Sequence, residues 1–216
     1  MRLWRTWQMA TVLAVLVVAG LVAWRYLPGP PTRHLDGEGP LSASSGHGGF
    51  VAAARPGTWY LAAAGNTLCL TEPGDPVTIS GVRHDERVRP LGLRTFVRTV
   101  SEADLVDGSR EGIAVGAAAY DRPADRPKHF RGTFSSDVAG TVVRQPCSVV
   151  RGAEDGIPDE GFAELVFEMK VGRAGASVPR TFVDYTRGRR AYTLVINWEI
   201  GACGTRVRRE LGAEYC

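Results

Sequence analysis

The sequence predicts an all-β protein, in which an antiparallel β-sandwich follows one N-terminal transmembrane helix. Three observations lead to this prediction. An apolar stretch opens the chain, short segments of alternating polar and apolar residues fill its second part, and turn residues separate these segments. With 216 residues, of which 44% are hydrophobic, the chain is long enough to bury a complete core.

The predicted transmembrane anchor covers residues 8–27 and follows a short cytoplasmic N-terminus at residues 1–7. No charged residue interrupts the stretch from Gln8 to Trp24, and about 20 apolar residues suffice to cross a bilayer as a helix. Aromatic residues flank the stretch on both sides, where such rings settle at the headgroup level. The alternative is a cleaved signal peptide, but the residues after Trp24 lack its pattern of small residues.

The basic residues around the anchor favour a cytoplasmic N-terminus. Arg2 and Arg5 join the amino terminus before the anchor, whereas Arg25 and Arg33 follow it. The more basic flank of a membrane helix usually stays in the cytoplasm. The sequence therefore predicts a single-pass cell-membrane protein with its C-terminal domain outside the cytoplasm.

The four cysteines agree with this orientation. Cys69, Cys147, Cys203 and Cys216 are even in number, widely spaced and free of any C-x-x-C pair. Such cysteines form disulfides outside the cytoplasm, and the alternative is four buried thiols in a cytosolic domain. Of the three possible pairings we favour Cys203 with Cys216, which would fasten the C-terminal tail, and Cys69 with Cys147.

Residues 28–50 are predicted to form a flexible linker between the anchor and the domain. The segment is rich in Pro, Gly and Ser, and Leu35 and Leu41 are its sizeable aliphatic residues. So few apolar side chains bury too little surface to offset the ordering of the backbone. His34 and His47 are accordingly expected to be solvated.

Residues 51–216 are predicted to form the extracytoplasmic β-sandwich domain. Period-two alternation is clearest around Leu165, Phe167 and Met169. Many short strands with frequent turns favour an immunoglobulin-like sandwich. The candidate strands are residues 58–63, 67–70, 76–83, 93–100, 113–120, 129–136, 141–150, 162–171, 180–185 and 191–200.

The last of these strands places Trp198 in the predicted core. Leu194, Ile196 and Trp198 alternate with polar or smaller residues, so they should face the space between the sheets. Glu199 should then lie on the solvent face, without special partners. A role of Trp198 in binding is the alternative.

The charge distribution argues against nucleic acid as a partner. Residues 51–216 carry 22 basic and 21 acidic side chains, so the domain lacks the field that holds phosphate backbones. A candidate basic surface would arise if the last two segments of the chain adjoin, and it could bind an anionic wall polymer or lipid headgroups. Its residues are Arg187, Arg189, Arg190, Arg206, Arg208 and Arg209.

No motif in the sequence indicates a catalytic, metal or cofactor site. The chain contains no G-x-S-x-G, and its acidic loops do not match the twelve-residue calcium loop. The stretch from Thr67 to Thr71 resembles the cysteine neighbourhood of sortases, but the family's spacing between threonine and cysteine is not reproduced. We therefore expect no catalytic residue, metal or cofactor.

The layout resembles that of single-pass envelope proteins of GC-rich Gram-positive bacteria that display one immunoglobulin-like domain, many of them without an assigned function. The resemblance covers the order of anchor and domain and the stretch W-E-x-x-A-C-G, from Trp198 to Gly204. It implies a cell-surface location and a binding or assembly role. The leading hypothesis is thus a non-enzymatic module that binds a protein or cell-envelope component, and the alternative is an envelope enzyme without recognisable motifs.

Overall fold

A computed structural model describes residues 30–43, 48–62, 66–105, 117–122, 130–151, 161–212 and 216. The chain divides into two compact units, Met1–Pro30 and Pro31–Cys216. The predicted anchor at residues 8–27 and the predicted cytoplasmic N-terminus at residues 1–7 lie outside the described residues. In the described part of the chain, no helix has the length and apolar character needed to cross a bilayer.

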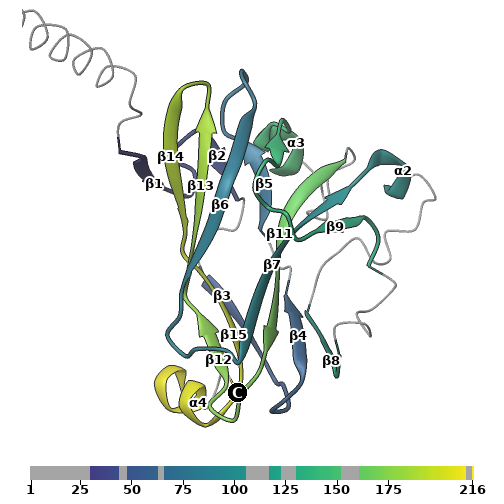
Figure 1. Ribbon diagram of the computed structural model, residues 1–216, viewed down its shortest axis with the longest axis vertical. Helices are drawn as coiled ribbons and strands as arrows, with labels where there is room; N and C mark the ends of the chain where they lie inside the picture. The colour runs from purple at the N-terminus through teal and green to yellow at the C-terminus, as the bar shows by residue number, and fades with distance from the viewer. Residues whose placement is uncertain are drawn as a thin grey trace, which may run out of the picture. The chain divides into compact units, whose positions relative to one another are not determined.

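The second unit is built almost entirely of β-strands, which confirms the predicted all-β class (Figure 1). One sheet contains, in spatial order, β1 (Thr32–Leu35), β14 (Arg190–Ile196), β13 (Arg180–Arg187), β6 (Val77–Asp85) and β10 (Val142–Val143). A second sheet contains β2 (Leu41–Ser42), β5 (Thr67–Leu70), β11 (Phe162–Lys170), β4 (Trp59–Ala62) and β8 (Ala117–Tyr120), with β7 (Gly92–Val100) on β11 and β9 (Thr133–Ser135) on β7.

A smaller third sheet and three short helices complete the described elements. The sheet contains β12 (Ala176–Val178), β15 (Trp198–Ala202) and β3 (Gly48–Ala52), and the helices are α2 (Glu102–Leu105), α3 (Cys147–Arg151) and α4 (Thr205–Leu211). The pairings of β1 with β14 and of β3 with β15 are parallel, and the other pairings between the described strands are antiparallel. The expectation of a purely antiparallel sandwich is therefore wrong at these two strands.

The main hydrophobic core joins the three sheets. Leu165, Phe167 and Met169 of β11 contribute to it, as the alternation in the sequence predicts, and they belong to the same cluster as Val183 of β13 and Leu194 of β14. The opposite face of β11 packs a smaller cluster, in which Val166 contacts Phe96 and Leu61. Strand β11 is thus buried on both faces.

Strands β12 to β15 are one long hairpin that bends in the middle. Val178 pairs with Ile200, whereas Thr181 pairs with Ile196, so two residues of one arm face three residues of the other. The bend includes Pro179, which lacks a backbone N–H for the ladder. This irregularity carries the hairpin from the five-stranded sheet into the three-stranded sheet.

The expectation of a flexible linker over residues 28–50 is wrong for most of that segment. Its strand β1 adds to β14, β2 adds to β5 in the opposite sheet, and β3 adds to β15. Leu41 is fully buried, and its N–H donates a hydrogen bond to the Tyr185 hydroxyl at 3.3 Å. The burial of Leu41 and the backbone pairing at open strand edges stabilise this segment, and neither can be read from its amino-acid composition.

His34, expected to be solvated, is likewise fastened to the domain. Its Nε2 lies 2.7 Å from the Tyr185 hydroxyl, and the Tyr185 and Tyr192 rings stack with their centroids 5.2 Å apart. Asp36 closes the crossing between β1 and β2, because its carboxylate accepts hydrogen bonds from the Ser42 hydroxyl and the Ala43 N–H. Residues 31–43 therefore form a strap across the two sheets, which we call the N-terminal strap.

The prediction for residues 192–200 holds in part. Leu194 and Ile196 are fully buried, and the half-buried Trp198 packs against the main core. Glu199, however, is not an exposed residue without partners. Its carboxylate accepts a hydrogen bond from the Ser177 hydroxyl at 2.6 Å and pairs with Arg87 at 3.2 Å, and its side chain is 18% exposed.

The strands expected at residues 67–70, 76–83, 93–100 and 162–171 are close to those observed. The single strand expected at residues 141–150 is wrong, because only Val142–Val143 form a strand there, Pro146 makes an isolated bridge to Leu70, and α3 follows from Cys147. Pro146 offers no N–H for a continued ladder, and it stands directly before α3. This break creates one wall of the site described next.

Candidate functional site

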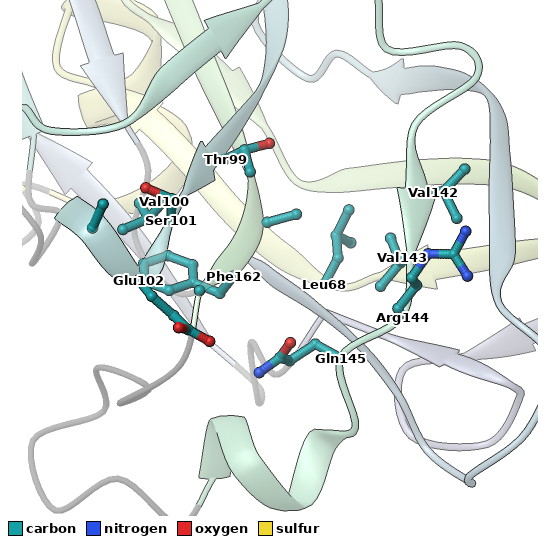
Figure 2. A pocket seen from close by; sticks show the side chains of 13 residues that line it. Leu68, Thr99, Val100, Ser101, Glu102, Val142, Val143, Arg144, Gln145 and Phe162 are labelled. Carbon is teal, nitrogen blue, oxygen red and sulfur yellow. The ribbon is translucent and has the colours of Figure 1, made fainter. Parts of the chain in front are cut away.

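A pocket of about 510 Å³ opens where the end of β7, the start of β11 and the segment around β10 meet. Figure 2 shows Thr99, Ser101, Glu102 and Phe162 along one side, Val142, Val143 and Arg144 along the other, and Leu68 between them. Its floor is apolar, since Leu68, Val143 and Phe162 are buried to at least 94%. Its rim is polar.

The pocket exists because one edge of β5 changes its partner. Leu68 pairs with Ala163 of β11, but two residues later the N–H of Leu70 donates to the carbonyl of Gln145 at 2.7 Å. Alternate residues of a strand point their backbone groups to the same edge, so both bonds lie on one side of β5. The space between Ala163 and Gln145 remains open above Leu68.

The Cys69–Cys147 disulfide fixes the β10 side of the pocket. Cys69 follows Leu68 in β5, and Cys147 begins α3 directly after Pro146. Both cysteines are buried, and their Cα atoms lie 4.8 Å apart. The bridge therefore holds the wall that contains Arg144 and Gln145 against β5.

The opposite wall is held by hydrogen bonds around α2. Asp104 accepts hydrogen bonds from the N–H and the hydroxyl of Ser101, at 2.8 and 2.6 Å, and these bonds lower the pKa of the Asp104 carboxyl. The guanidinium of Arg131 donates to the carbonyl of Asp104 at 3.0 Å. In turn, the Nε of Arg98 donates to the carbonyl of Arg131 at 2.7 Å.

Arg98 anchors this wall through a buried ion pair with Glu164. The two residues face each other across β7 and β11, Nη1 lies 2.6 Å from Oε1, and their side chains are 0% and 3% exposed. Burial raises the pKa of the Glu164 carboxyl to about 8, although the nearby Arg98 charge and its hydrogen bond act in the opposite direction. The pair lies outside the pocket lining and supports its rim indirectly.

Two opposite charges stand on the pocket rim without a partner among the described residues. Glu102 lies on the α2 side and Arg144 on the β10 side, and both are exposed. Neither makes a hydrogen bond or an ion pair within the described part of the chain. In Figure 2 the amide of Gln145 points toward Glu102 from the opposite wall. An apolar floor with such a rim can bind an apolar group that is flanked by polar or charged groups.

The structure brings together only some of the residues that the sequence singled out. The predicted disulfides Cys69–Cys147 and Cys203–Cys216 are confirmed. The six arginines of the candidate basic surface do not adjoin, because Arg187, Arg189 and Arg190 surround the β13–β14 turn and the other three belong to α4. These groups lie at opposite ends of the second unit (Figure 1), separated by strands β14 and β15, a length of roughly 40 Å at 3.3 Å per residue.

The pocket itself was not predicted from the sequence. Its lining comes from β5, β7, α2, β10 and β11, so no local motif marks it. Within the described residues, no group of three or more histidine, cysteine or acidic residues is arranged to hold a metal ion. Comparison of the chain with models of known families, with curated proteins and with solved structures finds no match.

Proposed function

We propose that this chain is a membrane-anchored extracytoplasmic binding module, which recognises a protein or cell-envelope component through the pocket between α2 and β10. The observation that carries the proposal is the pocket's apolar floor together with the charges of Glu102 and Arg144 on its rim, which have no partner within the residues that the structure describes. A pocket of this volume lies within the range of about 300–1,000 Å³ of ligand sites. Its walls are fixed by a disulfide and an ion pair, so the site is formed before a ligand binds.

The two disulfides support the extracytoplasmic part of this proposal. Disulfides persist in oxidising compartments and are rare in the cytoplasm. Together with the apolar stretch at residues 8–27 and the basic residues before it, they favour a domain outside the cell membrane.

Orientation is tested with reporter fusions after Pro30, because a fusion after Gly49 would fall within β3. Alkaline phosphatase at this point should be active, and a cytoplasmic fluorescent reporter should be dark. The reverse result would overturn the proposed topology.

The finer assignment of an immunoglobulin-like sandwich also belongs to this proposal. The antiparallel ladders of β6, β13 and β14 and of β7 and β11, with a core between sheets, support it. The parallel strands β1 and β3 are additions to such a plan.

A protein partner is favoured over an anionic wall polymer. The six arginines lie in two separate groups, and Arg206 of α4 is paired with Glu210 at 2.6 Å. The acidic Glu102 on the rim would also repel a polyanion.

The alternative, an envelope enzyme, would place groups with displaced pKa values in the pocket. Two such groups, Glu164 and His84, lie outside its lining and bind structural partners.

Site-specific photo-crosslinking in the native membrane tests the proposal. A photoreactive residue at Val142, which lines the pocket and is 43% exposed, should give a discrete adduct that mass spectrometry can identify. The matched control is Leu91, an exposed apolar residue at 67% that precedes β7, whereas the pocket borders the end of that strand. Equal labelling at both positions, or none at Val142, would contradict a recognition site in this pocket.

A further inference from the structure

Strand β10 is the last strand of the five-stranded sheet and borders the pocket. It pairs with β6, in the register Val142 with Thr78 and Val143 with Val77. Next to this register, Ile79 turns both of its backbone groups toward the same segment, because its N–H donates to the carbonyl of Thr141 and its carbonyl accepts from the N–H of Gly140, each at 2.8 Å. Successive residues of a strand direct their backbone groups to opposite edges, so the N–H and C=O of Thr78 point away from β10, and those of its partner Val142 point away from β6.

These outward groups of Val142 have no hydrogen-bond partner in the described part of the chain. The Val142 side chain is 43% exposed, although valine is usually buried. An unpaired strand edge beside an exposed apolar residue is a template for a further strand.

The pocket floor lies within reach of such an added strand. Side chains of a strand alternate between its two faces, so an extended chain along β10 would direct alternate side chains toward the floor. Leu68, Val143 and Phe162 offer that floor an apolar surface. The rim then places Arg144 beside the added strand and Glu102 across from it.

We infer that the ligand of this pocket is an extended peptide segment of a partner protein, which adds to the free edge of β10 as a strand. One apolar side chain of the segment occupies the floor, a basic residue lies near Glu102 and an acidic residue lies near Arg144. Backbone hydrogen bonds supply affinity in this mode of recognition, and side-chain pockets supply specificity. The inference rests on the proposed function and names the class of partner for the same site.

The chemistry of the edge distinguishes a peptide from other ligands. A lipid or a sugar would use the floor or the charges, but it has no regular spacing of N–H and C=O groups to match Val142. A polyanion would pair with Arg144 and be repelled by Glu102. An extended peptide satisfies the edge, the floor and both charges together.

The test uses the full chain in lipid nanodiscs and a displayed library of random ten-residue peptides. Selected peptides should carry one apolar residue with charged residues of opposite sign on its two sides. Val142→Pro removes only the outward N–H, because this residue does not bond to β6, and it should weaken binding of a selected peptide by about tenfold. Val142→Ala retains the N–H and is the matched control, with an expected change below about threefold.

Two further measurements keep the inference falsifiable if Val142→Pro fails to fold. A peptide whose methylated backbone nitrogens face β10 should no longer bind. A peptide methylated at the intervening nitrogens, which face away from β10, should bind as before. Glu102→Lys should weaken binding, and exchange of the peptide's basic residue for an acidic one should restore it.

The outcomes separate this inference from the proposed function. Crosslinking at Val142 combined with an empty peptide selection, or with binding that ignores backbone methylation, would overturn the peptide mode and leave the pocket as the recognition site. The absence of both crosslinking and peptide binding would overturn both.

Discussion

His84 connects the two large sheets through its ring nitrogens. Its Nδ1 lies 3.2 Å from the hydroxyl of Thr181 in the same sheet, and its Nε2 lies 2.7 Å from that of Thr95 in β7. The ring also contacts Phe167 edge-on, with centroids 5.3 Å apart. Burial lowers the pKa of His84 to about 4, so the imidazole is neutral at physiological pH.

This shift predicts a loss of stability in acid. Below the ordinary pKa of about 6.5 the unfolded chain takes up a proton that the folded chain accepts only near pH 4, so stability is full above pH 6.5 and falls between these values. The expected loss at pH 4 is about 3 kcal/mol. Chemical denaturation of residues 31–216 and of His84→Gln at several pH values measures it.

The difference in unfolding free energy between parent and His84→Gln should shrink as the pH falls. The comparison is needed because Glu164 acts in the opposite sense. Its raised pKa contributes stability that is present below its ordinary pKa and is lost as the pH rises through about 8. A difference independent of pH would show that His84 titrates normally.

The Arg98–Glu164 pair predicts a strong dependence on both partners. Above about pH 8, where the Glu164 carboxyl is ionised, Arg98→Met leaves a buried carboxylate without its cation and should cost about 3–5 kcal/mol, whereas the double variant Arg98→Met/Glu164→Leu should recover much of this loss. The exposed pair Arg180–Asp85, with side chains 52% and 41% exposed, is the control and should contribute at most about 1 kcal/mol. Additive losses in a double-mutant cycle at Arg98 and Glu164 would disprove the coupling.

At the scale of elements, the N-terminal strap closes the edges of two sheets. Strand β1 covers β14, and β2 covers β5 on the opposite sheet. Each contact is short, but Leu41 adds a fully buried side chain to the main core. A domain fragment that begins at residue 50 lacks β1 and β2, so fragments for experiments should begin at Pro31.

Two leucines of the strap test its packing. Leu41→Ala should destabilise the domain by about 2–5 kcal/mol, because it leaves a cavity in the core. Leu35→Ala, in β1, removes a side chain that is 44% exposed and should change stability by about 0.5 kcal/mol or less. Equal effects in urea denaturation would mean that the strap is not docked in solution.

At the scale of the whole molecule, two disulfides constrain very different lengths of chain. Cys69–Cys147 joins residues 78 positions apart, and Cys203–Cys216 joins residues 13 positions apart. The longer loop costs the unfolded chain more entropy when it is closed. The first bridge also holds a pocket wall, whereas the second fastens the tail after α4.

Replacement of each cysteine pair by alanine should reflect this difference. Chain-entropy reasoning gives a loss of about 4.5 kcal/mol for Cys69/Cys147 and about 3 kcal/mol for Cys203/Cys216. Peptide mapping without reductant should recover only these two linkages, and denaturation gives the two losses. A peptide that joins Cys69 to Cys216 would refute the connectivity.

Local patterns in the sequence determined much of the fold of this protein. Alternation predicted β11 and its core residues Leu165, Phe167 and Met169, because a strand with one face in the core must place apolar residues at every second position. The sequence allowed three disulfide pairings, and the favoured one, in which the short closure between Cys203 and Cys216 fastens the tail and leaves Cys69 for Cys147, is confirmed by the structure.

Tertiary structure alone decided the strap and the pocket. The strap has a composition typical of a linker, and its strands exist because the edges of β5 and β14 offer unpaired backbone groups. The pocket arises because, along one edge of β5, Leu68 pairs with Ala163 whereas Leu70 bonds to Gln145. Both partners are far from β5 in the sequence. Which strands become neighbours decides where a sheet has edges and gaps. The alternation of polar and apolar residues within one strand does not tell which strands will pair with it.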